Sequence, residues 1–361
     1  MLCIDLFVSG RLCLFGEHSD WASEYRRIDK NMPKGYSLIV GTNQGIHARV
    51  KPLKEKLLIT STLPDGKIEG PCELEMNEKK LREKARCGDF FSYCAGVASY
   101  IQRNHQVDGL LIENYQMDLP IKKGLSSSAA ICILTAQAFN TVYKLKLTRR
   151  GEMEIAYQGE IMTPSRCGRM DQACAYGSTP VLLTFHGDYM DVEPIYPKEP
   201  LYIVVVDLKK KKNTRKILSE LNKHYSAIHS KISLDMQKAL GKLNKSVVLR
   251  ARKAIEAGDC HKIGELMKEA QTIFDKKILP ACPSELTAPK LHKVLNYPGI
   301  QSFILGGKGV GSQGDGSAQF ITRDSKEQSL LIETMERELD VSCLPLTIPR
   351  GKPVQVSQRQ S

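Results

Sequence analysis

Three serines stand where a glycine-containing turn leads into a long apolar run. The stretch PIKKGLSSSAAICIL covers residues 120–134, and Ser126, Ser127 and Ser128 come just before its apolar part. The first turn of a helix carries unpaired N–H groups and a partial positive charge, so it binds anions. A helix cap needs one hydroxyl rather than three. The pattern therefore predicts a phosphate site in which one serine can ligate Mg²⁺, with simple capping as the alternative.

A second group of polar side chains follows an apolar stretch near the N-terminus. The sequence SGRLCLFGEHSDW, residues 9–21, reaches Gly16, and Glu17, His18 and Asp20 follow it. Carboxylates and an imidazole at the end of a strand are suited to hydrogen-bonding a hydroxylated ligand. The alternative is an ordinary surface turn.

Two carboxylates flank a loop in the middle of the chain. In GEIMTPSRCGRMDQACAYG, residues 159–177, Glu160 lies near the end of an expected helix and Asp171 begins the next helical turn. Side chains separated by a loop in this way can converge, one on a metal ion and one on a substrate. Because most acidic residues are simply solvated, the spacing alone does not decide between the two interpretations.

A glycine-rich loop lies near the C-terminus. Five glycines occur between Gly307 and Gly316 in GGKGVGSQGDGSAQF, residues 306–320, which is more than a tight turn requires. Such a loop favours close approach of the backbone to a ligand, and a flexible hairpin is the alternative.

The elements that must position these groups follow from hydrophobic periodicity. Apolar alternation predicts strand pairs at 2–15 and 37–51, and Pro-rich residues 196–200 predict a joint between two α+β domains. A buried helix is expected at 127–143 because its apolar residues occur nearly all round. The remaining expectations are strands at 56–62, 109–120, 201–207 and 342–348, a hairpin over 179–195, a strand-loop-strand over 303–323, and helices at 89–104, 149–162, 214–230, 234–257, 259–275 and 325–338.

Composition limits the class of protein. A chain of 361 residues suggests two domains. The sequence contains no run of about 20 apolar residues, so no transmembrane helix is expected. Eleven cysteines without a Cys-x-x-Cys pair favour reduced thiols and a cytoplasmic protein over a disulfide framework or a zinc site. The net charge of +12 includes the basic segment 207–216, which we interpret as a solvated face. Nucleic-acid binding is the alternative, but no aromatic residues interleave with the lysines.

Together, the four motifs resemble those of the GHMP small-molecule kinases, from about residue 8 to residue 322. The family's first motif resembles GRLCLFGEHSDW, its phosphate loop resembles PIKKGLSSSAA, and its third motif resembles the loop at 306–318. The galactokinase branch is the most similar, since it shares Gly-Leu-Ser-Ser-Ser-Ala and Cys-Gly-x-Met-Asp-Gln. Cys13 and Trp21 stand where galactokinases usually have asparagine and tyrosine, so the acceptor is left open among galactose and related aldoses.

The resemblance implies a role for each matching residue. It implies that Arg11 and Asp171 are catalytic and that Ser128 and Glu160 ligate Mg²⁺. The implied sugar contacts are Glu17, His18, Asp20, Gly168 and Asp171; the implied ATP contacts are Lys122, Gly124, Leu125, Ser126, Ser127, Ser128 and Ala129; and the third glycine loop contributes Gly309, Gly311 and Gly314.

The resemblance also implies a fold and an activity. The expected fold is two-domain α+β: a GHMP kinase N-terminal domain like ribosomal protein S5 domain 2 at 1–197, a ferredoxin-like domain at 198–349, and a disordered tail at 350–361. The expected activity is transfer of the ATP γ-phosphate to a sugar hydroxyl, the anomeric one of galactose or a related aldose, by a protein with no nucleic-acid or membrane partner, expected to be a monomer. The alternatives are a kinase for a mevalonate-like alcohol and a ligand-sensing regulator without turnover. Uronic acids, heptoses and other sugars stay open as acceptors.

Overall fold

The chain forms two compact units that each combine segments distant in the sequence. A computed structural model describes residues 3–119, 125–165, 167–226 and 230–351. The first unit comprises Met1–Leu12 with Ile39–Ser178, and the second comprises Cys13–Leu38 with Thr179–Ser361. Strands β1 (Ile4–Phe15) and β2 (Gly35–Leu53) each contribute residues to both units. The domain ranges 1–197 and 198–349 stay a prediction, and residues 352–361 of the expected tail lie outside the described residues.

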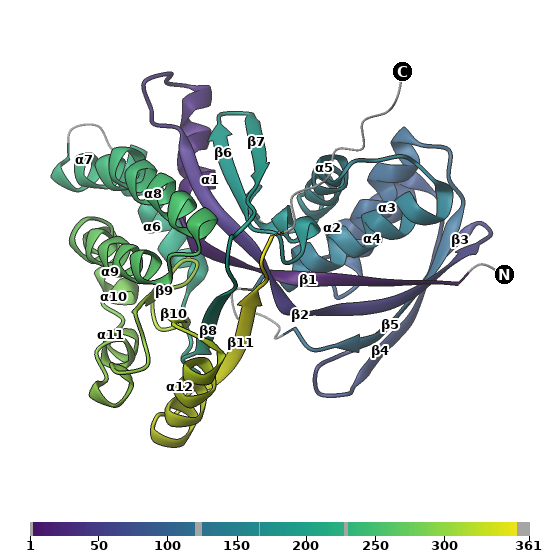
Figure 1. Ribbon diagram of the computed structural model, residues 1–361. Helices are drawn as coiled ribbons and strands as arrows, with labels where there is room; N and C mark the ends of the chain where they lie inside the picture. The colour runs from purple at the N-terminus through teal and green to yellow at the C-terminus, as the bar shows by residue number, and fades with distance from the viewer. Residues whose placement is uncertain (1–2, 120–124, 166, 227–229, 352–361) are drawn as a thin grey trace, which may run out of the picture. The chain divides into compact units, whose positions relative to one another are not determined.

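A mixed sheet with helices on one side forms the first unit (Figure 1). Its strands follow the order β4-β3-β5-β2, and β1 pairs with β2. The β3–β5 pair is parallel, whereas β2–β5 and β3–β4 are antiparallel. Besides β1 and β2, the elements of this unit are β3 (Lys56–Thr62), β4 (Ile68–Glu75), β5 (Gly109–Met117), α2 (Glu78–Cys87), α3 (Ser92–Asn104), α4 (Ser127–Tyr143), α5 (Arg149–Glu160) and the 3₁₀ helix η2 (Asp171–Tyr176).

Close packing of two helices fixes the end of α5. A Cβ on Gly96 of α3 would lie 2.2 Å from the carbonyl oxygen of Gly159, and a Cβ on Gly159 would lie 2.6 Å from Val97. The two backbones therefore approach to a distance that no larger residue permits. Glu160, the next residue, is held at this contact and is completely buried.

The second unit contains a four-stranded antiparallel sheet in the order β11-β8-β10-β9. In chain order the four strands are β8, β9, β10 and β11, so the spatial order is 4-1-3-2 with helices after the first and third strands. That topology is the ferredoxin-like arrangement predicted from the sequence. The strands are β8 (Leu201–Asp207), β9 (Gly306–Gly309), β10 (Ser317–Thr322) and β11 (Ser342–Ile348).

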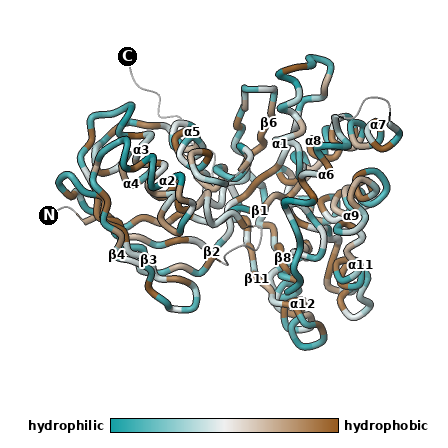
Figure 2. The backbone as a smooth tube through the Cα atoms, turned by 180° about the vertical axis from the view of Figure 1, so that it is seen from behind, coloured by the Kyte–Doolittle hydropathy of each residue, from teal (hydrophilic) through white to brown (hydrophobic). Residues whose placement is uncertain are grey.

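The other elements of the second unit are helical, apart from one antiparallel hairpin of β6 (Val181–His186) and β7 (Tyr189–Pro194). Helix α12 packs on the sheet with Leu331 and Met335, and Figure 2 shows both hydrophilic and hydrophobic residues along this helix. The helices are α1 (Ser19–Glu24), α6 (Thr214–Ser226), α7 (Lys231–Lys238), α8 (Asn244–Ala257), α9 (Cys260–Lys277), α10 (Pro283–Leu286), α11 (Pro289–Leu295), α12 (Ser325–Glu338), a π-helical turn at Ala239–Leu243 and short 3₁₀ turns at Tyr25–Arg27, Leu279–Ala281 and Pro298–Ile300.

Several predicted elements need correction. The expected strand pairs at 2–15 and 37–51 are the single strands β1 and β2. Gly41 and Gly45 lie within β2 and do not interrupt it, because neither has the positive φ that a tight hairpin turn requires. The helix expected at 234–257 is divided into α7, the π-helical turn and α8. Strand β4 and helix α2 were not predicted. No helix among the described residues is long and apolar enough to cross a membrane.

Candidate active site

An arginine and an aspartate form a close pair in the first unit. Arg11 lies on β1 and Asp171 begins η2, and the side chain of Arg11 is almost buried. Arg11 Nε and Nη2 donate to Asp171 Oδ1 over 3.0 and 2.5 Å. Because both bonds end on the same oxygen, Asp171 Oδ2 is not used by this pair. The two residues predicted to be catalytic are therefore brought together, 160 positions apart in the sequence.

A second carboxylate, Glu160, is buried close to this pair. Burial raises its pKa to about 7, and the nearby Asp171 carboxylate adds to the increase. The side chains of Ser128, Gln172 and Cys167 oppose it, and Gln172 Nε2 donates to Glu160 Oε2 over 2.9 Å. Among the described residues, no group makes a hydrogen bond of ordinary geometry to Glu160 Oε1. A buried carboxylate oxygen without a partner is unfavourable unless something else binds there.

These residues fit the predicted Mg²⁺ site. Ser128, the second residue of α4, lies close enough to Glu160 to lower its pKa, so a hydroxyl and an unpaired carboxylate oxygen are neighbours. Mg²⁺ prefers oxygen ligands and usually keeps several waters and substrate phosphates, so one or two protein oxygens are enough. No cluster of three or more acidic, histidine or cysteine residues within the described ranges could hold a metal ion by itself.

The N-terminus of α4 lies in the same unit. Ser126 precedes the helix with φ of 56°, and its side chain makes no capping hydrogen bond within the described part of the chain. The capping alternative is therefore not what this serine does. Ser126, Ser127 and Ser128 are partly exposed, whereas Leu125 and Ala129 are buried. Lys122 and Gly124 lie outside the described residues, so the ATP-binding role of the loop stays a prediction.

The second unit carries the predicted acceptor contacts of the first motif. His18 is buried, accepts a hydrogen bond at Nδ1 from Trp21 Nε1 over 3.0 Å, and stacks on Phe274. Burial lowers its pKa to about 3, and Lys212 and Lys308 add to the decrease, so the imidazole is neutral. With Nδ1 accepting, the proton lies on Nε2, which has no partner among the described residues. Asp20 is half-buried in the first turn of α1.

Glu17 is paired with a residue that the sequence analysis did not single out. Lys308 Nζ donates to Glu17 Oε1, and both side chains are almost completely buried. Lys308 lies in β9, at the start of the third glycine loop. The only available signal was a lysine set between glycines after an apolar strand, which does not identify its partner 291 residues away.

The third glycine loop is held by polar side chains rather than free. Gln271 Oε1 accepts from the N–H of Gly309 over 2.7 Å, and Gln271 Nε2 donates to Gln313 Oε1 over 3.0 Å. Gly311 and Gly314 have positive φ, as their positions in the loop require. The flexible-hairpin alternative does not fit these contacts. Gly168, the remaining predicted sugar contact, is half-buried in the first unit between α5 and η2.

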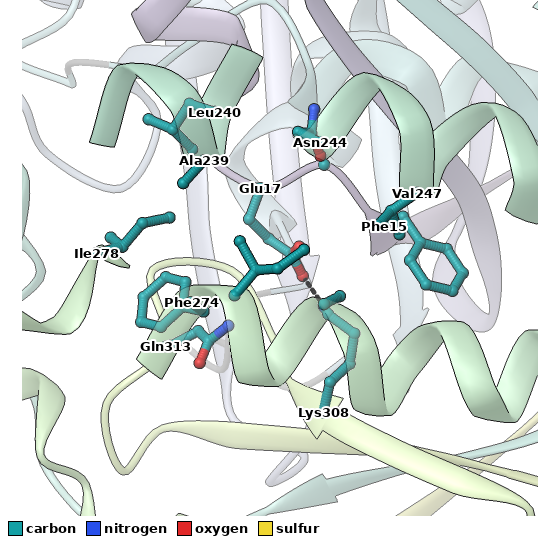
Figure 3. A pocket seen from close by; sticks show the side chains of 13 residues that line it. Phe15, Glu17, Ala239, Leu240, Asn244, Val247, Phe274, Ile278, Lys308 and Gln313 are labelled. Carbon is teal, nitrogen blue, oxygen red and sulfur yellow. Dashed lines mark hydrogen bonds and ion pairs between the residues drawn. The ribbon is translucent and has the colours of Figure 1, made fainter. Parts of the chain in front are cut away.

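A cavity with a volume of about 40 Å³ lies beside Glu17 and Lys308 (Figure 3). Most of its wall is apolar, and Glu17, Asn244, Lys308 and Gln313 supply the polar groups. The apolar part of the wall comes mainly from the π-helical turn, α8 and α9, with Phe15, Ala239, Leu240, Val247, Ala270, Ile273, Phe274 and Ile278.

The basic segment is only partly the solvated face that was predicted. Lys210 forms a 2.8 Å ion pair with the buried carboxylate of Asp315, and Lys212 Nζ donates to the carbonyl oxygen of Gln313 over 3.2 Å. Both contacts hold the third glycine loop. Lys211, in contrast, is exposed, as expected for a solvated residue.

Lys210→Ser is expected to lower the melting temperature by about 2–4 °C, because Asp315 then loses a partner for its buried carboxylate. Lys211→Ser, the exposed neighbour, is the matched control and is expected to melt within about 1 °C of the parent. Thermal unfolding followed by circular dichroism at low and high salt checks both. Equal melting temperatures for the two variants would mean that the Lys210–Asp315 pair contributes nothing to stability.

The sequence matches known proteins along most of its length. Residues 92–178 match the family described as the GHMP kinases N-terminal domain. A galactokinase from Thermococcus kodakarensis is 27% identical over 357 residues, which cover 92% of this chain and 93% of the relative. A galactokinase from Thermotoga maritima is 28% identical over 168 residues, which cover 46% of this chain and 41% of the relative.

Solved structures share the fold. Lactococcus lactis galactokinase complexed with galactose has a TM-score of 0.72 at 17% identity, and the match covers 97% of this chain and 94% of that one. L. major mevalonate kinase in complex with R-mevalonate has a TM-score of 0.69 at 18% identity, with 96% of both chains covered. At these identities the likeness concerns the fold alone, and it confirms the predicted two-domain α+β architecture.

Proposed function

Because the chain belongs to the GHMP kinase family and resembles its galactokinase branch, we propose that it is an ATP- and Mg²⁺-dependent sugar kinase. The proposed reaction transfers the γ-phosphoryl group of ATP to the anomeric hydroxyl of galactose or a related aldose. The observation that carries the proposal is the grouping of Arg11, Asp171 and Glu160 in one unit. Phosphoryl transfer needs positioned groups and charge neutralisation rather than a covalent intermediate, and these residue types supply both.

Each residue of the first unit has a proposed part in the transfer. Asp171 Oδ2 accepts a hydrogen bond from the reacting hydroxyl, while the two bonds from Arg11 fix the carboxylate through Oδ1. Arg11 also places a permanent positive charge beside the reacting group. The backbone N–H groups at the start of α4 bind phosphate oxygens. Ser128 and Glu160 would hold Mg²⁺, which when bound neutralises phosphate charge.

An ADP-release assay over a panel of aldoses, with mevalonate and a reaction without acceptor alongside, tests the proposal. The proposed function requires an aldose to give the fastest release. Faster turnover of mevalonate would assign the chain to a different acceptor class, and the absence of ADP release with every acceptor in the panel would identify a regulator without turnover. Hydrolysis of the product by mild acid checks the anomeric position, because sugar 1-phosphates are acid-labile.

Asp20→Ala is expected to raise KM for the sugar about a hundredfold and to leave KM for ATP within about threefold. An acceptor hydroxyl that loses a half-buried carboxylate partner binds less well, whereas ATP does not depend on this side chain. Steady-state kinetics with each substrate varied in turn measures the two constants. An equal rise in both would indicate that Asp20 supports the fold rather than the acceptor.

A further inference from the structure

Glu17 and Lys308 form a buried ion pair in the cavity wall. The wall therefore carries two opposite charges whose sum is zero. The side chain of Lys308 is 2% exposed and that of Glu17 is 8% exposed. Burying either charge alone is strongly unfavourable, so the pairing of the two side chains compensates for their burial. In Figure 3 the two side chains point toward one another, and a dashed line marks their ion pair.

This pair has unused hydrogen-bonding capacity. A lysine ammonium has three N–H donors, and Lys308 uses one on Glu17 Oε1 and one on the carbonyl oxygen of Gly309, over 2.8 Å. Among the described residues, no group accepts from the third N–H or donates to Glu17 Oε2. One donor and one acceptor are therefore left side by side at the cavity.

Strand pairing and hydrogen bonds fix the backbone around Lys308 and Glu17. Lys308 lies opposite Gln319 in the β9–β10 register, and Gln319 Nε2 donates to the carbonyl oxygen of Cys13 over 2.8 Å, just before Glu17. The N–H of Gly309, the residue after Lys308, is bonded to Gln271. The donor and the acceptor therefore keep a fixed separation, which is what recognition of one small group requires.

We propose that Glu17 and Lys308 together recognise one hydroxyl of the acceptor, with Lys308 Nζ donating a hydrogen bond to its oxygen and Glu17 Oε2 accepting a hydrogen bond from its O–H. The proposal rests on the proposed function and makes Lys308 a specificity-determining residue of the same reaction. A hydroxyl is a donor and an acceptor at once, so it satisfies both partners. A hydrogen in its place satisfies neither, and a carboxylate faces Glu17 as a like charge.

The apolar remainder of the wall strengthens this selection. Leu240, Val247 and Phe274 limit the water that can replace a missing hydroxyl, so an acceptor lacking it leaves two buried groups unpaired. Sites built to hydrogen-bond a substrate hydroxyl reject analogues without it far more strongly than apolar pockets reject an extra methylene.

The experiment measures kcat/KM for the preferred aldose and for its singly deoxygenated analogues. In the parent, one analogue is expected to lose at least about a hundredfold. In the double variant Glu17→Gln/Lys308→Met, which removes both charges at similar volume, the loss for that analogue is expected to shrink to within about threefold. KM for ATP is expected to stay within threefold. Glu17→Gln alone leaves Lys308 without its counter-charge, so the ratio of uronic acid to aldose turnover is expected to rise at least tenfold.

The matched control removes an ion pair of the same kind from the surface of the same unit. Arg252 and Glu256 are partly exposed partners on α8, and Arg252→Met/Glu256→Gln should keep every deoxygenation loss at its parental value. If the double variant at the cavity does not fold, Glu17→Gln alone is expected to reduce the loss at least tenfold. Unchanged losses in a folded variant overturn this proposal and leave the proposed function standing. A parent that turns over no sugar overturns both.

Discussion

Replacing Asp171 with asparagine is expected to lower kcat about a thousandfold or more while ATP still binds. Asparagine keeps the shape of the side chain, but its amide cannot accept the proton of the reacting hydroxyl at nitrogen and carries no charge for Arg11. Positioned proton acceptors contribute about a hundred- to ten-thousandfold to rates of this kind. Single-turnover ADP formation measures the chemical step, and calorimetric titration of the variant with ATP measures nucleotide binding.

Asp65→Asn is the control for this substitution. Asp65 is an exposed aspartate of the same unit that accepts a hydrogen bond from the backbone N–H of Lys67, so its variant is expected to keep parental kcat. The melting temperatures of both variants are compared, because Arg11 loses the ionic part of its pair in Asp171→Asn. Activity of Asp171→Asn within tenfold of the parent would contradict a catalytic role for this carboxylate.

Local patterns were sufficient for the elements whose own sequence determines them. The helix expected at 127–143 has the bounds of α4, because apolar residues all round and a serine-rich start are properties of that segment alone. The periodicity of 37–51 indicated strand correctly but could not show that β2 is continuous through Gly41 and Gly45. A glycine in an extended strand and a glycine in a turn have the same letter, and only pairing with other strands distinguishes them.

The candidate site likewise contains residues that the sequence could identify and one that it could not. The resemblance to the family's motifs was enough to select Arg11 and Asp171, and the structure brings them together. Lys308 could not be selected, since the nearest acidic residue in the sequence, Asp315, is not its partner but pairs with Lys210. Its counter-ion is Glu17, and that contact is created by the second unit combining residues 13–38 with the C-terminal half of the chain.

Glu160→Gln is expected to raise the Mg²⁺ concentration needed for half-maximal activity, to lower kcat/KM at least about a hundredfold, and yet to stabilise the free protein at high pH. The folded pKa of Glu160 is raised from 4.5 to about 7, so the native state binds this proton more tightly than the unfolded chain does. The stability that the bound proton contributes is present below the unfolded pKa and is lost as pH rises through about 7. The shift corresponds to about 3 kcal/mol, which glutamine does not lose because it does not ionise.

Thermal unfolding of parent and variant without nucleotide, from pH 5 to pH 8.5, measures this difference. The variant's advantage is expected to grow across the interval and to level off above about pH 7.5, where Glu160 is ionised. Glu154→Gln on the same helix is the control with the opposite sign. Although partial burial raises its pKa, hydrogen bonds from Gln158 and Arg169 outweigh that effect and leave the Glu154 pKa lowered, so neutralising it is expected to destabilise mildly at neutral pH.

In the parent, the Mg²⁺ concentration needed for half-maximal activity is expected to fall as pH rises through 7, since the metal then no longer competes with a proton. A Mg²⁺ requirement that is independent of pH, or an unchanged titration in both Glu160→Gln and Ser128→Ala, would show that these oxygens do not hold the metal.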